Sequence, residues 1–289
     1  MKQWLVIDAP FMCHRAFHSS RDLTHNGRST SAIFGFLMSL GQLKDEFHTE
    51  HMAFCFDHDR LFRRDILPGY KLKRRTKERT PEEQEQRKQL GVQIKELEKR
   101  WLPMIGFKNV FSYRGMEADD IMATIARERR AAGEGVVIVT ADNDLLQCIR
   151  HTTSVHNPIS SKTFTREWFV REHGIKPAEW AIVKALAGCS SDEVPGIRGV
   201  GEKTALKYLR GELNPDSMIA NRINSYEGKS IKMRNKPLVL LPHSNCPIPK
   251  LQTDNVTREG WEQVCSDLGM KSLISRLPIS IRKRSVKKP

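Results

Sequence analysis

Short apolar runs alternate with longer amphipathic segments over the first half of the chain. Runs rich in β-branched and aromatic residues predict strands at 3–8, 52–57, 109–113 and 135–142. Helical spacing of apolar residues and helix-start residues predict helices at 29–47, 80–102, 116–133 and from about residue 142 onwards. Strands that alternate with helices are typical of an α/β fold with a mostly parallel central sheet and flanking helices.

The pattern changes near residue 175. Residues 176–188 predict a helix, and residues 190–209 predict a turn, interrupted by Gly and Pro, that leads into another helix. A proline-rich stretch at 237–249 predicts a loop. We therefore expect a first domain at 1–175 and a second, mainly α-helical domain at 176–289.

Basic residues outnumber acidic ones across the chain. The 289 residues hold 48 Lys+Arg against 34 Asp+Glu, a net charge of +14. Residues 60–79 carry much of the excess, and residues 276–289 form a basic tail without an acid. This distribution predicts a polyanionic partner, most simply nucleic acid, over the alternative of a well-solvated surface.

Cysteines and apolar runs exclude several classes of protein. The 6 cysteines are scattered without a C-x-x-C pair, which favours reduced thiols over a disulfide frame or a zinc site. No apolar run approaches the ~20 residues that span a bilayer. Asp8 comes too early for a secretory signal. We expect a cytoplasmic protein with no membrane partner.

Acidic residues follow each of the four predicted strands. They are Asp8, Asp57, Glu117, Asp119, Asp120, Asp142 and Asp144. In an open parallel sheet the carboxyl ends of the strands share one edge, where ligands bind. So many neighbouring carboxylates must share protons, pair with Lys or Arg, or bind cations.

A divalent metal explains this acidic edge better than a set of unrelated helix caps, which is the alternative for any one acid. Mg²⁺ prefers oxygen ligands and often also takes phosphate oxygens. An acidic metal site beside a basic segment predicts phosphodiester hydrolysis, in which two metals activate water and stabilise the leaving oxygen.

Five motifs resemble the 5′-nuclease or flap-endonuclease family, which includes the amino-terminal nuclease domain of bacterial DNA polymerase I and stand-alone phage enzymes. In order over roughly the first 210 residues they are "VIDAPFMCHRAFHS", "FDHDRLFRRDILPGYKLKRR", "GMEADDIMATIA", "TADNDLLQ" and "SSDEVPGIRGVGEKTA". The resemblance implies a PIN-like nuclease core, a helical arch at about 60–100 and a helix–hairpin–helix motif at 190–209. It also implies a Mg²⁺-dependent enzyme that cuts DNA near the junction of a 5′ single strand with duplex, or a 5′→3′ exonuclease.

The resemblance also implies roles for particular residues. The first metal group would be Asp8, Asp57, Glu117 and Asp119 with Asp120 beside them, and the second Asp142, Asp144 and Asp192. Lys71 and Arg74 would hold the scissile phosphate, with Arg15 nearby. DNA contacts are expected in the arch from Tyr70, Lys73 and Arg75. In the hairpin they are expected from Gly196, Gly199, Gly201, Lys203 and Thr204, where a K⁺ ion often binds.

One departure concerns the second metal. Cys189 stands where the family typically has an Asp, and Glu193 where it has an Asn. A thiol is a poor Mg²⁺ ligand, so we expect a weak second site at which Mn²⁺ can substitute. His14 and His18 lie four residues apart, but their segment matches a packing helix of the family rather than a metal pair.

Two rival functions stay open. One is a non-catalytic protein that binds DNA junctions, and the other is a PIN-like ribonuclease, against which the basic arch and the hairpin argue. We expect a monomer without an obligate protein partner, from a bacterial or phage-infected cell. The motifs do not separate endonuclease from exonuclease activity.

Overall fold

The computed structural model describes residues 2–19, 23–58 and 61–278. Most of the predicted basic tail at 276–289 therefore lies outside the described residues. The chain forms two compact units, the first made of residues 1–2, 57–78 and 112–249 and the second of residues 3–56, 79–111 and 250–289. These units divide the chain differently from the predicted boundary at residue 175. No described helix is long and apolar enough to cross a membrane.

The second unit contains three parallel strands in the order β5, β4, β1. They are β1 (Gln3–Asp8), β4 (His51–Cys55) and β5 (Val110–Phe111). All residues of β1 except Gln3 are buried, as expected for a parallel strand covered on both faces. The register places Ile7 beside Phe54 and Asp8 beside Cys55, so the acid lies at the carboxyl end of its strand.

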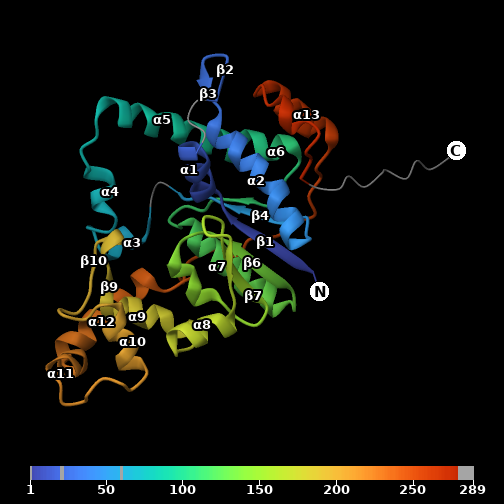
Figure 1. Ribbon diagram of the computed structural model, residues 1–289. Coiled ribbons are helices and arrows are strands. Elements are labelled where there is room, and N and C mark those ends of the chain that lie inside the picture. Colours follow the sequence, from blue (N-terminus) through green and yellow to red (C-terminus); the bar gives the residue numbers. More distant parts are fainter. Residues whose placement is uncertain (1, 20–22, 59–60, 279–289) are drawn as a thin grey trace. The chain divides into compact units, whose positions relative to one another are not determined.

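Helices α1 (Ala9–Ser19) and α2 (Ser31–Phe47) pack on each other in this unit (Figure 1). The close approach depends on Gly35, because a Cβ at that position would lie 2.6 Å from the Cβ of Ala16. The predicted helix at 29–47 is therefore present, and its apolar face packs against α1.

The predicted helix at 80–102 consists of three parts. They are α5 (Pro81–Glu96), a π-helical turn η1 (Leu97–Trp101) and α6 (Leu102–Ile105). Thr80 and Glu83 form a reciprocal capping box at its start. The buried Gln93 accepts the N–H of Ala32 at 3.0 Å, which ties α5 to the start of α2.

The remaining elements of the second unit are short strands and a C-terminal helix. They are β2 (Thr24–His25), β3 (Arg28–Ser29), α13 (Arg258–Asp267) and the 3-10 turn η5 (Lys271–Leu273). Asp254 accepts the backbone N–H of Lys108 at 2.7 Å, and this contact holds the segment before α13 against residues 105–111.

The first unit has its own strands, with a helix packed against them. Strands β6 (Gly135–Val139) and β7 (Thr153–Asn157) are parallel, and β8 (Lys162–Phe164) joins β7 antiparallel. Helix α7 (Ala118–Ala131) matches the prediction at 116–133 and packs on β6 (Figure 1).

The helix predicted from about residue 142 is a 3-10 segment, η2 (Asn143–Cys148). Asp142 accepts the N–H of Asp144 at 2.7 Å, which starts a tight turn. The chain then has to reverse between Arg150 and Thr153 to enter β7, so no full α-helix forms here.

The rest of the first unit is mainly helical, as predicted for the C-terminal part. Its elements are α3 (Arg63–Ile66), α4 (Leu72–Thr76), α8 (Arg166–His173), η3 (Pro177–Glu179), α9 (Trp180–Ala187), β9 (Gly188–Cys189), η4 (Ser190–Asp192), β10 (Val194–Pro195), α10 (Glu202–Leu209), α11 (Met218–Asn224) and α12 (Tyr226–Val239). Helices α9 to α12 gather together in Figure 1. Helix α12 continues through Pro237, so the predicted loop at 237–249 begins only at residue 240. The predicted arch at about 60–100 includes α3 and α4 of this unit and α5 of the other.

Candidate metal centre

The start of α7 gathers two of the predicted metal ligands. Glu117 is the N-cap residue of this helix, and Asp57 accepts the N–H of Ala118 at 2.9 Å. Acids are favourable here because the first backbone N–H groups of a helix lack partners inside it. Asp119 lies in the same first turn. The structure thus brings Asp57, Glu117 and Asp119 of the predicted first group to one helix end.

Asp120 is held by a buried arginine rather than presented to solvent. The Arg63 guanidinium donates to Asp120 Oδ2 at 2.5 Å and Oδ1 at 2.8 Å, and to Glu117 Oε2 at 3.1 Å. Asp120 also accepts the N–H groups of His243 and Glu117 at 2.7 and 3.2 Å. Its oxygens are occupied, which argues against the predicted role as a metal ligand.

The pKa of Asp120 agrees with this structural role. Burial alone would raise the pKa of this carboxyl, but the paired Arg63 outweighs burial and lowers the pKa below its ordinary value. Arg63 also donates from Nε to the Leu238 carbonyl at 2.9 Å. Arg63 therefore joins the acidic start of α7 to the end of α12.

Tyr70 and Lys71 approach Glu117 from the segment between α3 and α4. The Tyr70 hydroxyl donates to Glu117 Oε2 at 2.8 Å, and the side chain is 2% exposed. The predicted DNA contact by Tyr70 does not agree with this burial. Lys71, with φ of 53°, places its ammonium on Glu117 Oε1 and 3.7 Å from Asp192 Oδ1.

Part of the predicted second metal group also comes together. The ligand atoms of Asp144, Cys189 and Asp192 all lie within 4.8 Å of one another. Asp142 is not part of that cluster of ligand atoms, although it accepts the N–H of Asp144 at 2.7 Å and, besides burial, its charge helps to raise the pKa of Asp192. Asp192 Oδ1 accepts from Arg74 at 2.9 Å, although the Arg74 side chain remains 56% exposed.

Burial makes the charged forms of three acids of this centre less favourable. Burial of the carboxyl groups raises the pKa of Asp57, Asp142 and Asp192, and for Asp142 the neighbouring Asp144 raises it further. Asp57 and Asp142 nevertheless keep exposed surface as whole residues, so a cation could reach them from solvent. Such a set of oxygens is chemically suited to bind cations.

Cys189 is a neutral ligand candidate in this centre. Burial raises the pKa of its thiol above the ordinary value. Its sulfur lies 3.0 Å from Ser191 Oγ. Glu193, the other departure from the family pattern, accepts the N–H of Lys73 at 3.2 Å. Lys73 and Arg75 themselves are exposed on α4, as a DNA contact requires.

Asp8 and Arg15 belong to the second unit, and their predicted roles at the metal and the phosphate stay predictions. Asp8 ends β1 and accepts the N–H of Phe11 at 3.0 Å, at the start of α1. Arg15 is exposed on α1. The His14 and His18 rings stack with centroids 6.5 Å apart.

The Gly-rich hairpin connects α9 with α10. Gly199 adopts φ of +80°, a conformation that favours glycine. At Gly196 a Cβ would lie 2.1 Å from the Ala187 carbonyl oxygen, so this glycine serves internal packing rather than approach to a phosphate. Gly201 caps α10 in open space, and Lys203 is exposed in the first turn of that helix. Thr204, half-buried, follows it.

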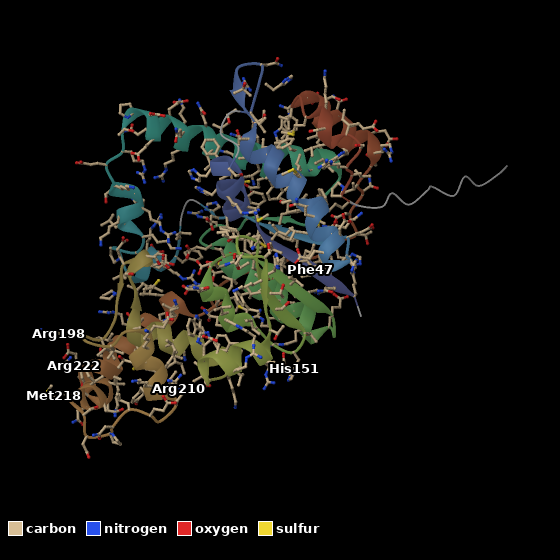
Figure 2. The ribbon with its side chains drawn as sticks, viewed as in Figure 1. Phe47, His151, Arg198, Arg210, Met218 and Arg222 are labelled. Atoms are coloured by element: carbon tan, nitrogen blue, oxygen red, sulfur yellow. The ribbon has the colours of Figure 1, made fainter. Side chains whose placement is uncertain are left out.

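Arginines that the motifs did not single out also bind the hairpin. The Arg222 guanidinium donates to the Arg198 carbonyl at 2.6 Å, and Figure 2 labels both residues close together. A K⁺ ion at this carbonyl would compete with Arg222. The predicted K⁺ therefore stays a prediction.

Sequence reasoning missed two cations of the centre, Arg63 and Lys184. Arg63 was hidden among the many basic residues of 60–79. Lys184 Nζ lies 3.1 Å from Asp144 Oδ1. Its signal was present, because it is a single charge within the apolar helix α9, "WAIVKALA".

The sequence of the chain is similar to those of known proteins. Residues 3–174 match the family model described as 5′-3′ exonuclease, N-terminal resolvase-like domain. DNA polymerase I of Thermus thermophilus is 32% identical over 219 residues, which cover 75% of this chain and 25% of that protein. DNA polymerase I of Mycobacterium leprae is 32% identical over 277 residues, or 90% of this chain and 29% of that protein. The chain thus spans only about a quarter to a third of the length of these curated relatives.

Solved structures share the fold over nearly the whole chain. The bacteriophage T5 D15 flap endonuclease, in a complex with DNA and metal ions, superposes with a TM-score of 0.70 at 20% identity, covering 95% of this chain and 98% of that one. The catalytic core of Rad2 with a DNA substrate gives a TM-score of 0.56 at 15% identity, covering 96% and 93%. The predicted fold, a mostly parallel sheet with flanking helices and a helical C-terminal part, is confirmed.

Proposed function

The chain belongs to the 5′-3′ exonuclease family, and we propose that it is a structure-selective DNA 5′-nuclease that depends on a divalent metal, Mg²⁺ in the first instance. Its substrate is DNA with a 5′ single-stranded end or flap next to duplex. The observation that carries this proposal is the meeting of Lys71 and Arg74 with the acids of the centre at Glu117 and Asp192.

The first acid group fits a divalent ion. Asp57 and Asp119 offer carboxylate oxygens at one helix end, and Glu117 would join them where the ion replaces Lys71 on its Oε1. Asp8 is the further ligand that the sequence predicts. The bound ion would supply an activated water and charge stabilisation for phosphodiester hydrolysis. The second group fits Mg²⁺ less well, because its third donor is the neutral thiol of Cys189.

Lys71 and Arg74 orient the scissile phosphate in this mechanism. Both carry positive charge at the edge of the acid cluster, and Arg74 is exposed enough to contact a DNA strand. Burial would lower the pKa of Lys71, but Glu117 and Asp192 outweigh burial and raise it, so the ammonium stays protonated. Fixed positive charge beside a phosphate stabilises the negative charge that develops as the bond to the leaving oxygen breaks.

The hairpin binds the duplex part of the substrate in this proposal. Lys203 and the N-terminus of α10 suit phosphate contacts, which carry no base sequence information. The proposal includes a monomer in the cytoplasm, a K⁺ ion at the hairpin and replacement of Mg²⁺ by Mn²⁺.

Cleavage of matched oligonucleotides tests the proposal. We expect Mg²⁺-dependent cutting of a 5′-flap DNA near its junction, and much slower cutting of 3′-flap, single-stranded and RNA controls. The Asp119→Asn variant should lose at least about 100-fold in rate while its DNA affinity in a gel-shift assay stays within a few-fold of wild type. Near-normal turnover by this variant would contradict the metal assignment.

A DNA-junction binder without catalysis is the second candidate. The thiol of Cys189 and the lysine on Asp144 favour it, because both weaken the second metal group. Tight binding of the 5′-flap substrate, with no cleavage by wild type in Mg²⁺ or Mn²⁺, would establish this candidate instead.

A further inference from the structure

Lys184 lies against the second acid group in a position that its surroundings fix. Its ammonium is 3.1 Å from Asp144 Oδ1 and 3.5 Å from Glu202 Oε2. The side chain is 14% exposed, and its Nζ lies 5.3 Å from the centroid of the Trp180 ring one turn earlier in α9. A cation over an aromatic face gains further attraction when it is shielded from water.

Trp180 also fixes the acid that Lys184 meets. Its indole N–H donates to the Asn143 carbonyl at 2.9 Å, directly before Asp144 in the chain. The ring is 2% exposed. The Trp180 side chain therefore contacts the Lys184 ammonium with its ring and holds the start of η2 with its N–H. Packing, rather than a mobile surface contact, sets the distance between Lys184 and Asp144.

Positive groups lie against two carboxylates of the second group, Asp144 and Asp192, without any metal. Lys184 contacts Asp144, while Arg74 and Lys71 lie 2.9 and 3.7 Å from Asp192. Cys189, the remaining member of the cluster, adds no negative charge while its thiol is protonated. A divalent ion placed among these donors would meet an ammonium at close range and would lack one hard oxygen ligand.

We propose that Lys184 is the resident cation of the second acid group, so that its ammonium takes the place of a second divalent ion and the centre holds one metal instead of two. This inference rests on the proposed function for its meaning in catalysis, but its geometry stands on Lys184, Asp144 and Trp180 alone. Cys189 and Lys184 are linked in this proposal. Compared with the family pattern, Cys189 removes a carboxylate ligand, and Lys184 supplies a positive charge in place of the ion.

Counting tightly bound Mn²⁺ by calorimetry and by the electron paramagnetic resonance signal of free Mn²⁺ tests the proposal without DNA. We expect one tight ion for wild type, which Asp119→Asn removes. The double variant Lys184→Met/Cys189→Asp should bind a second ion, with an affinity on the order of tenfold or more above any weak second binding in wild type, since a nearby positive charge is removed and a ligand is added.

Two further variants separate charge from structure. Lys184→Arg keeps the charge, so the double variant Lys184→Arg/Cys189→Asp should keep the count at one. Lys207→Met removes an exposed lysine of α10, and this lysine has no carboxylate partner among the described residues. The number of tightly bound Mn²⁺ ions in this variant should equal that of wild type. Two tight ions in wild type, or a second ion in the Lys184→Arg/Cys189→Asp protein, would overturn the inference. Absence of flap cleavage would instead overturn only the proposed function.

Discussion

Replacing Arg63 by Met should lower the free energy of unfolding by about 3–5 kcal/mol at neutral pH, the range for removing one partner of a buried ion pair. The Arg63 side chain is 3% exposed and that of Asp120 is 0% exposed. Met is close to Arg in apolar length but donates no hydrogen bond. The variant therefore leaves a buried carboxylate and the Leu238 carbonyl without the donor that the structure gives them.

The loss should depend on pH. In wild type, burial would raise the pKa of Asp120, but Arg63 outweighs it and lowers the pKa. This carboxylate therefore stabilises the fold above its unfolded pKa, and the stabilisation is lost as pH falls through the lower folded pKa. In Arg63→Met burial acts without the arginine, so the unpaired carboxylate takes up a proton more readily and the difference from wild type shrinks on acidification.

Urea unfolding at pH 7 and pH 5, followed by tryptophan fluorescence, measures both effects. The double variant Arg63→Met/Asp120→Asn should recover part of the loss at pH 7, because no unpaired charge is left behind. Arg127→Met serves as the control, since Arg127 is 47% exposed and pairs only with Glu128 among the ion pairs described for it, which predicts a loss of at most about 1 kcal/mol. Equal losses for Arg63→Met and Arg127→Met, or simple additivity in the double variant, would refute the reasoning.

Three further predictions concern DNA. Lys71→Ala and Arg74→Ala should each lower the single-turnover rate of 5′-flap cleavage by about 100-fold while the dissociation constant changes much less; if only the dissociation constant changes, both residues are general tethers. Lys203→Ala should weaken duplex binding by a few-fold regardless of base sequence and reduce the salt dependence by about one phosphate contact, and unchanged affinity would remove the hairpin from the interface. Lys184→Met/Cys189→Asp should reach half-maximal cleavage at a lower Mg²⁺ concentration than wild type, whereas identical titration midpoints and maximal rates would exclude these two positions from the metal site.

Hydrophobic periodicity predicted strands β1, β4, β5 and β6 and helices α2, α5, α7, α9 and α10. It did not predict strands β7 and β8 or helices α1, α8 and α11 to α13. In strand β1 and in helices α2 and α7, burial on one face or on both sets the spacing of apolar residues. This spacing can be seen in a short stretch of sequence. The π-helical turn at Leu97–Trp101 and the 3-10 form of Asn143–Cys148 depend on the direction that the chain takes after each segment. The local spacing of apolar residues therefore does not predict them.

The candidate site also has features that the sequence predicts and features that it does not. The spacing of acids after the strands predicted a cluster, and the first unit does bring Asp144 and Asp192 together with Cys189. Sequence alone did not separate Asp120 from its neighbours, because a carboxylate that pairs with a buried arginine and one that binds metal are the same residue type. Tyr70 shows the converse: an aromatic residue in a basic segment resembles a DNA contact until its burial is known.

The pairing of acids with Lys71 and Arg74 has a consequence for DNA binding. Both basic side chains contact carboxylates, Lys71 at Glu117 and Arg74 at Asp192, so these acids offset part of the positive charge that a phosphate would meet. A divalent ion at Glu117 would neutralise that acid and leave the Lys71 ammonium available for phosphate. Metal and DNA should therefore each increase the affinity of the other by the same factor, as linkage requires of two ligands whose sites are coupled. On the proposed function, the acidic cluster of this basic protein does not oppose DNA binding, because an ion bound at Glu117 would offset the negative charge that repels the strand.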